Sequence, residues 1–98
     1  MIKKSLIGKS VLVVEDDPKI RQLVKIYLMK DGYEVIEAVN GLDAKQKIEE
    51  LDPCMLILDL MLPEISGEEI CRWVREDLKS MMPIIMLTAK VAEKNRIQ

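Results

Sequence analysis

The amino-acid sequence predicts an α/β fold in which helices cover both faces of a doubly wound parallel sheet. Short apolar runs alternate along the chain with segments of helical periodicity, which is typical of strands joined by crossover helices. Such crossovers are right-handed and leave the strands parallel. A length of 98 residues, 49% of them hydrophobic, provides one core and not two. We therefore expect a single domain over residues 1–98 with four strands.

The first strand is expected at Val11–Val14, a continuous aliphatic run of the kind that is buried on both faces of a sheet. Three acids follow it, Glu15, Asp16 and Asp17. Asp17 with Pro18 predicts an N-cap and the first turn of a helix. Gly32 is placed to end that helix, whose apolar stripe consists of Ile20, Leu23, Val24, Tyr27 and Leu28.

The middle of the chain repeats this pattern of strand and helix. Tyr33–Ala38 alternates apolar and polar residues, as an edge strand does. Asn40 and Gly41 open a second helix, and Asp52 followed by Pro53 ends it. The apolar residues expected along this second helix are Leu42, Ala44, Ile48 and Leu51.

Two further strands are expected in the second half of the chain. Cys54–Leu58 is a buried run that Asp59 ends, and Pro83–Leu87 is a fourth run. Between them, Ser66 and Glu69 have the spacing of a capping box for a third helix. The apolar stripe of that helix is Ile70, Trp73, Val74 and Leu78, and a fourth helix is expected to begin at Val91.

The absence of histidine excludes several classes of chemistry. Without it the chain cannot form a Ser-His-Asp or Cys-His nucleophile, a His-ligated zinc site or a phosphohistidine carrier. A net charge of −2 with no basic stripe argues against direct nucleic-acid binding. The sequence has no signal peptide and no apolar run of about 18 residues, so we expect a cytoplasmic chain without membrane contact. Cys54 and Cys71 are expected to be small buried apolar residues.

Ligands of doubly wound folds bind at the carboxyl ends of the strands, where this chain carries acids. If the first and third strands are neighbours, Asp16 and Asp59 lie close together. Carboxylates in contact repel unless a cation lies between them, and all-oxygen ligands favour Mg²⁺. A nearby hydroxyl, Thr88, suits phosphoryl chemistry in which one Asp is the nucleophile. The alternative is that the acids are solvated caps and Thr88 a helix-entry residue; Asp17 favours the cap interpretation, and Glu15 is left open.

Three segments of the sequence resemble the response regulator receiver domain of two-component signalling. They are Val11–Asp17, Leu56–Gly67 and Pro83–Ala89, and together they span essentially the whole chain. The resemblance implies the flavodoxin-like fold with strand order 2-1-3-4-5. It also implies a signalling domain that takes part in its own phosphorylation and dephosphorylation rather than an enzyme. The last two segments are similar to regulators with a winged-helix DNA-binding output domain.

The resemblance also implies roles for individual residues. Asp59 matches the phosphoacceptor, which receives a phosphoryl group from a sensor histidine kinase. Asp16 matches a direct Mg²⁺ ligand, as does Asp59 itself. Glu15 matches an acid that acts on the metal through water, and Met61 matches the position whose backbone carbonyl binds the metal.

Two more residues match the family's switch, and one family residue has no counterpart. Thr88 matches the hydroxyl that meets the phosphoryl oxygen, and Ala89 the small residue that leaves room for it. The family's fifth strand, last helix and phosphoryl-pairing Lys do not occur before Gln98, and we interpret Lys90 as a loop charge. The fourth strand would then be an exposed edge, which tends to pair with another chain. We expect a fragment of a longer protein, with a dimer or another intermolecular arrangement as the alternative.

Two other functions stay open. A receiver-like interaction module would keep the fold without phosphorylation; the missing Lys favours this reading, and the presence of Asp16, Asp59 and Thr88 disfavours it. A Mg²⁺-dependent phosphohydrolase of the haloacid-dehalogenase type also uses an Asp nucleophile at a strand end. That chemistry normally needs a second Asp two residues later, where this chain has Met61.

Overall fold

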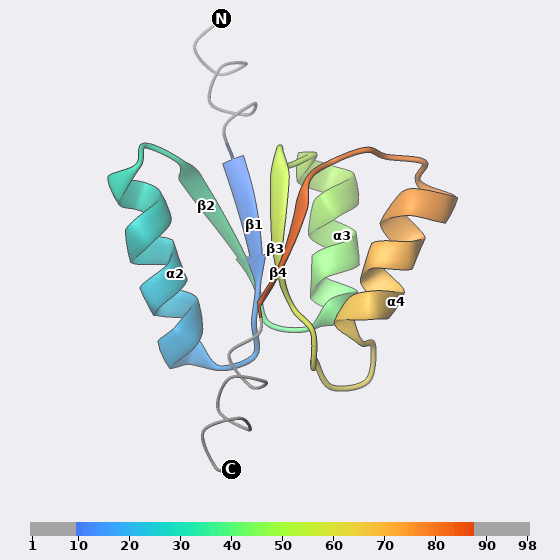
Figure 1. Ribbon diagram of the computed structural model, residues 1–98, viewed down its shortest axis with the longest axis horizontal. Helices are drawn as coiled ribbons and strands as arrows, with labels where there is room; N and C mark the ends of the chain where they lie inside the picture. Colours follow the sequence, from blue (N-terminus) through green and yellow to red (C-terminus); the bar gives the residue numbers. More distant parts are fainter. Residues whose placement is uncertain (1–9, 88–98) are drawn as a thin grey trace, which may run out of the picture.

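The computed structural model describes residues 10–87 and forms a parallel four-stranded sheet with helices on both faces (Figure 1). The strand order is β2-β1-β3-β4, and every neighbouring pair is parallel. The predicted α/β fold and its order 2-1-3-4 are therefore confirmed. In chain order the elements are β1 (Ser10–Val14), α2 (Pro18–Lys30), β2 (Glu34–Ala38), α3 (Gly41–Leu51), β3 (Met55–Asp59), α4 (Gly67–Arg72), a π-helical segment (Trp73–Asp77) and β4 (Ile84–Leu87).

The register of the sheet brings the ends of the two central strands together. Val14, the last residue of β1, lies opposite Leu58 of β3. Asp59 is the last residue of β3 and lies opposite Leu87 of β4. Whatever follows β1 and whatever ends β3 therefore meet at the same edge of the sheet.

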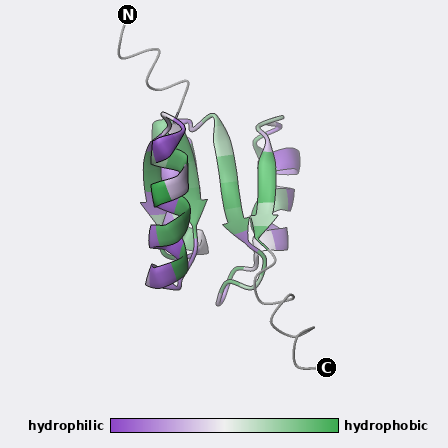
Figure 2. Cartoon of the chain, turned by 60° about the vertical axis from the view of Figure 1, so that its left-hand side comes forward, coloured by the Kyte–Doolittle hydropathy of each residue, from purple (hydrophilic) through white to green (hydrophobic). Residues whose placement is uncertain are grey.

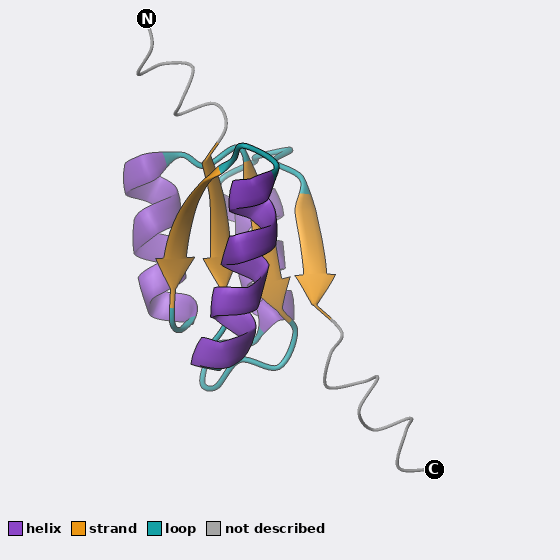
Figure 3. Cartoon of the chain, turned by 90° about the vertical axis from the view of Figure 1, so that its left-hand side faces the viewer, coloured by secondary structure: helices purple, strands orange, loops and turns teal. Residues whose placement is uncertain are grey.

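The two faces of the sheet carry hydrophobic clusters of unequal size. The smaller cluster consists of the buried Val11, Val13 and Ile57, packed against Val24 and Leu28 of α2 and a few other partly buried residues. Figure 3 shows α2 in front of the sheet, with the paler α3 and α4 behind it. The larger cluster lies on the side of α3 and α4 and consists of Leu12, Val14, Ala38, Ala44, Ile48, Leu56, Leu58, Leu62, Ile70 and Val74.

The helix ends form as the sequence predicts. Asp17 caps α2 by accepting the Lys19 N–H at 2.8 Å, and Asn40 caps α3 in the same way. Ser66 and Glu69 form the predicted capping box at the start of α4. After α2 the chain turns at Gly32, whose φ of 90° is a left-handed conformation that glycine adopts without strain.

Two apolar stripes are narrower than the sequence predicts. In α3 the buried residues are Gly41, Ala44 and Ile48, and Leu42 is 71% exposed. Helix α2 lies entirely within the described residues, and none of its side chains is buried. Tyr27, for example, is 63% exposed. The reason for α2 is that within residues 10–87 no second helix packs beside it. In Figure 2 the central strands are mostly hydrophobic, whereas α2 in front carries residues of both kinds.

The third helix is also less regular than predicted. Its first turns are α-helical, but Trp73–Asp77 is π-helical, which changes the face on which the later side chains lie. Val74 stays buried, while Leu78 is exposed. Cys54 and Cys71 are half-buried free thiols rather than fully buried residues.

Some predictions fall outside the described residues. These are Thr88, Ala89, Lys90 and the helix expected from Val91. Within residues 10–87, no helix has the length and the apolar character needed to cross a membrane.

Candidate functional site

Three carboxylates converge at the carboxyl end of the sheet. Glu15 and Asp16 directly follow β1, and Asp59 ends β3. One carboxylate oxygen from each of the three lies within 4.8 Å of the others. The predicted proximity of Asp16 and Asp59 is confirmed, and Glu15 joins them. We call these three residues the acidic cluster.

The acidic cluster is mostly hidden from solvent. Glu15 is 1% exposed and Asp59 is 3% exposed, whereas Asp16 is exposed. The pKa of Glu15 is raised to about 7, mainly by burial and to a smaller extent by the nearby Asp16 and Asp59. The Asp17 N–H, which donates to Glu15 Oε2 at 2.9 Å, opposes this rise. The raised pKa reflects the cost of holding several negative charges together in a buried place, and a cation would lower that cost.

Asp59 is fixed from the side of α4. The Met61 N–H donates to Asp59 Oδ1 at 3.1 Å, and the Gly67 N–H donates to the Leu60 carbonyl at 3.1 Å. A Cβ at Gly67 would lie 2.5 Å from the Asp59 carbonyl oxygen and 2.9 Å from Leu60 Cα. The start of α4 can therefore approach the backbone of Asp59 only because residue 67 has no side chain.

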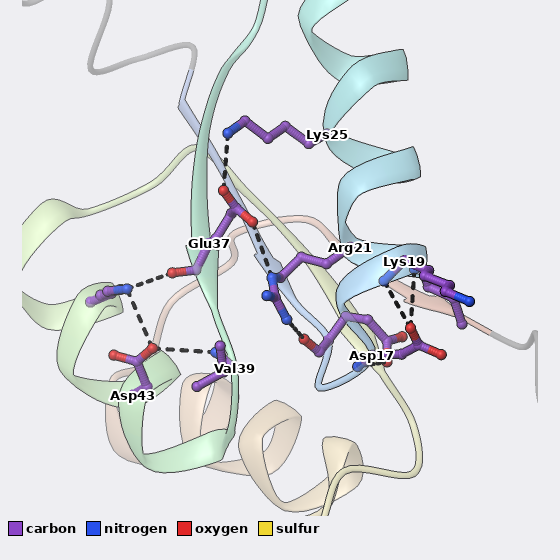
Figure 4. A network of polar contacts seen from close by, with 10 residues as sticks. Asp17, Lys19, Arg21, Lys25, Glu37, Val39 and Asp43 are labelled. Atoms are coloured by element: carbon purple, nitrogen blue, oxygen red, sulfur yellow. Dashed lines mark hydrogen bonds and ion pairs between the residues drawn. The ribbon is translucent and has the colours of Figure 1, made fainter.

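Glu15 is fixed from the side of α2 and β2. Its N–H donates to the Ala38 carbonyl at 3.1 Å, which extends the pairing of β1 with β2. Its carbonyl accepts a hydrogen bond from Arg21 Nη1 at 2.7 Å. Arg21 Nε in turn donates to Glu37 Oε1 at 3.0 Å, so Arg21 joins the loop after β1 to the edge strand β2 (Figure 4).

Glu37 is itself held by several cations. Lys25 contacts its second carboxylate oxygen at 3.0 Å, and Lys47 of α3 donates to its carbonyl. The Lys25 hydrogen bond, with a smaller contribution from Arg21, holds the pKa of Glu37 below its usual value despite partial desolvation. Sequence reasoning did not identify Gly67, Arg21 or Glu37. The available signals were a glycine directly after an N-cap and an arginine in the first turn after the acids.

The arrangement provides only oxygen donors. Carboxylates and backbone carbonyls are the ligands of hard divalent cations such as Mg²⁺, and the acidic cluster could hold one. Such a cation would offset the repulsion among Glu15, Asp16 and Asp59. The residues present therefore fit the predicted metal.

A separate cavity of about 200 Å³ lies between α3 and the end of α4, lined by Lys45, Glu69, Arg72, Trp73, Glu76 and Asp77. Lys45 Nζ lies 5.1 Å from the centre of the Trp73 ring, a cation–π contact within the chain itself. No residue of the acidic cluster lines this cavity.

A parallel α/β sheet with an acidic cluster of oxygen donors at the ends of its central strands is an arrangement that could hold a divalent cation. The family model described as "Response regulator receiver domain" matches residues 11–98. The chain belongs to this family and is a receiver domain of the two-component response regulators.

Curated relatives are regulators of transcription. Transcriptional regulatory protein GltR of Pseudomonas aeruginosa is 42% identical over 91 residues, which cover 92% of this chain and 38% of that protein. Transcriptional regulatory protein ResD of Bacillus subtilis is 47% identical over 88 residues, 90% of this chain and 36% of that protein. The chain thus spans well under half the length of these curated relatives.

Solved structures of response regulators share the fold. TrrA of Thermotoga maritima, in complex with Mg²⁺ and BeF, has a TM-score of 0.71 at 28% identity and covers 90% of this chain and 96% of its own. A complex of the histidine kinase ThkA with TrrA gives a TM-score of 0.76 at 42% identity, covering 83% of this chain and 69% of that one.

Proposed function

We propose that this receiver domain is a phosphoacceptor, in which Mg²⁺-dependent transfer of a phosphoryl group from a sensor histidine kinase to Asp59 switches an output or partner surface. The observation that carries this proposal is the acidic cluster: Asp59 lies at the end of a central strand, with oxygens of Glu15 and Asp16 within 4.8 Å. A structural neighbour complexed with a histidine kinase supports the choice of donor.

The chain's own residues would hold the metal. Asp16 and Asp59 would bind Mg²⁺ directly, the backbone carbonyl of Met61 would be a further ligand, and Glu15 would act through water. When bound, Mg²⁺ neutralises charge on the phosphoryl oxygens. The oxygen-only donor set and the raised pKa of Glu15 support this assignment.

The transfer needs Asp59 as an ionised nucleophile. A carboxylate oxygen of Asp59 forms a bond to phosphorus while the bond from phosphorus to the donor's imidazole nitrogen breaks. That nitrogen keeps the bonding electron pair, and the imidazole leaves; Asp59 becomes an acyl phosphate. The Met61 N–H on Asp59 Oδ1 orients the carboxylate, and burial of Asp59 limits access of competing water.

The switch residues belong to the proposal. Thr88 would turn its hydroxyl toward the phosphoryl oxygen, and Ala89 would leave room for it. Leu87 lies opposite Asp59 in the sheet, and Thr88 is the next residue in the sequence, which supports this role. Both residues lie outside the described range, so the proposal for them rests on sequence and register.

The proposed partners follow from the relatives. Their names as transcriptional regulators support a DNA-binding output domain of the winged-helix type, separate from this chain, and a cytoplasmic location. The receiver itself would contact no nucleic acid and no membrane, and would act as a signalling domain rather than as an enzyme with a separate substrate. A dimer is a further proposed state.

The test is the intact mass of the chain after incubation with acetyl phosphate and MgCl₂. We expect one added phosphoryl group, no addition in Asp59→Asn, and no addition when EDTA removes the metal. Asp77→Asn is the matched control, because Asp77 is exposed and is not part of the acidic cluster. An unmodified wild-type chain, or equal modification of Asp59→Asn, would overturn the proposal.

A further inference from the structure

We propose that Arg21 is a positioning residue for the acidic cluster: it fixes the peptide between Glu15 and Asp16, and thereby strengthens Mg²⁺ binding without touching the metal. This inference rests on the proposed function, since it assumes that the acidic cluster binds Mg²⁺. Arg21 lies in the first turn of α2, directly after the loop that carries the two acids.

The geometry of Arg21 is that of a bridge with two fixed ends. Nη1 donates to the Glu15 carbonyl at 2.7 Å, and Nε donates to Glu37 Oε1 at 3.0 Å. The side chain is only 16% exposed. Because the guanidinium is planar and rigid, fixing one of its nitrogens fixes the direction of the others.

Glu37 fixes the outer end of this bridge. It belongs to β2, and its carboxylate is held on the second oxygen by Lys25 at 3.0 Å. Its backbone carbonyl accepts a hydrogen bond from Lys47 of α3. Arg21 is therefore anchored to a strand that is itself tied to helices on both faces of the sheet (Figure 4).

The inner end of the bridge is the bond from Arg21 to Glu15, the residue at which the regular pairing of β1 with β2 ends. The Glu15 N–H makes a strand-like bond to the Ala38 carbonyl, and the Glu15 carbonyl bonds to Arg21. That carbonyl belongs to the peptide that leads into Asp16. Without Arg21, mutual repulsion of the three carboxylates could rotate this peptide and spread the ligands before the metal arrives. Groups of this kind, which orient a ligand from behind it, tune metal affinity.

The direction in which Mg²⁺ affinity changes on replacing Arg21 distinguishes a positioning role from a simple effect of its charge. Arg21 carries a positive charge near a cation site, so by charge alone its removal would tighten Mg²⁺ binding. Positioning predicts the opposite, a weaker affinity when the guanidinium is lost. It also predicts that Arg21→Lys weakens binding, because a single ammonium on a flexible stem cannot reproduce the two-ended bridge.

The experiment is titration of the chain with MgCl₂ by isothermal calorimetry, together with thermal melting without metal. We expect Arg21→Gln to raise the Kd for Mg²⁺ about tenfold, and Arg21→Lys to raise it less. Lys30→Gln is the matched control: it removes a cation from the last turn of the same helix, at the end away from Glu15 and Asp16. Its Kd should stay at or slightly below the wild-type value, even where its melting temperature falls.

The outcomes are distinct. A weaker affinity in Arg21→Lys and in Arg21→Gln, but not in Lys30→Gln, supports the inference; if Arg21→Gln does not fold, Arg21→Lys decides alone. An unchanged or tighter affinity in the folded Arg21 variants overturns it, even if they melt earlier, because Arg21 would then only stabilise the fold. A wild-type chain that binds no Mg²⁺ overturns the proposed function and this inference together.

Discussion

The two faces of the sheet differ in how firmly their helices are held. On one face, α3 and α4 cover a continuous cluster of buried side chains that includes residues of the helices themselves, such as Ala44 and Ile70. On the other, α2 contributes only partly buried residues over three buried strand side chains. Burial of apolar area is the main stabilising contribution, so we expect most of the stability of residues 10–87 to come from the first face.

The residues of the acidic cluster are held in place from both faces of the sheet. Asp59 is fixed by Met61 and by the close approach of Gly67 at the start of α4, on the well-packed side. Glu15 is fixed by polar contacts from Arg21 and Asp17, on the side of α2. Asp59, the proposed nucleophile, thus lies on the well-packed side, whereas Glu15 depends on hydrogen bonds that a single substitution can remove.

The largest expected effect contrasts the same residue type on the two faces. Ile70 of α4 is fully buried, and Ile26 of α2 is 47% exposed. Ile70→Ala should lower the free energy of unfolding by about 3–4 kcal/mol, because it leaves a cavity in the larger cluster. Ile26→Ala should change it by less than about 1 kcal/mol, since less area is lost and alanine favours the helix. Urea unfolding measures both, and equal losses would contradict the comparison.

The next effect tests the α2 side through pH. Glu15 has a pKa of about 7 in the folded chain against an ordinary value of 4.5. A raised folded pKa stabilises the fold fully below pH 4.5, and this contribution is lost as pH rises through 7. Without metal, the free energy of unfolding should fall by about 3 kcal/mol over this window, relative to Glu15→Gln.

Urea unfolding at several pH values in EDTA measures this difference. Saturating Mg²⁺ should weaken or reverse the slope, because a metal binds the deprotonated cluster more tightly. Parallel pH profiles for the wild type and Glu15→Gln in EDTA would show that Glu15 ionises normally and would contradict the prediction.

A smaller effect tests the α4 side. Gly67→Ala forces a Cβ to within 2.5 Å of the Asp59 carbonyl oxygen, so the backbone must move. We expect a loss of about 2 kcal/mol in the free energy of unfolding, and slower phosphorylation by acetyl phosphate, since Asp59 is displaced. Gly32→Ala is the control: its φ of 90° makes it destabilising, but it lies away from Asp59 and should leave the phosphorylation rate unchanged.

The smallest effect concerns the ion pairs of α2. Lys25→Gln removes a half-exposed pair with Glu37, which should cost about 0.5 kcal/mol and allow the pKa of Glu37 to rise toward its usual value. Carboxylate titration by NMR measures that pKa. A loss above about 2 kcal/mol would show that α2 depends on this pair far more than surface pairs usually allow.

The sequence predicts the fold and the position of the acids well, because these depend on local patterns. Aliphatic runs set the strands, and a parallel order brings Asp16 and Asp59 to one edge. Contacts between segments far apart in the chain are harder to predict from the sequence. Gly67 directly follows the N-cap Ser66, which is a local signal. Its role depends on how closely α4 approaches β3, and the local sequence does not show that distance.

The periodicity of a helix also cannot show which other elements pack beside it in the fold. The pattern of α2 predicts a buried stripe that includes Leu23 and Tyr27, but both are exposed. Within residues 10–87 no second helix packs beside α2 to cover them. The π-helical segment after α4 escapes prediction for another reason. A change in hydrogen-bond step alters the facing of Leu78 without altering the residue pattern that suggests a helix.

The placement of Asp59 within β3, opposite Leu87, has a mechanical consequence. Its main chain is part of the hydrogen-bonded ladder, with β1 on one side of the strand and β4 on the other. The hydrogen bonds of this ladder therefore oppose any displacement of the Asp59 backbone when charge is added to its carboxylate. If Asp59 is phosphorylated as proposed, we expect the loop that begins at Leu60 to move more than the strand that carries Asp59. In the proposed switch, the sheet is the fixed part of the domain and the loops at its edge are the parts that move.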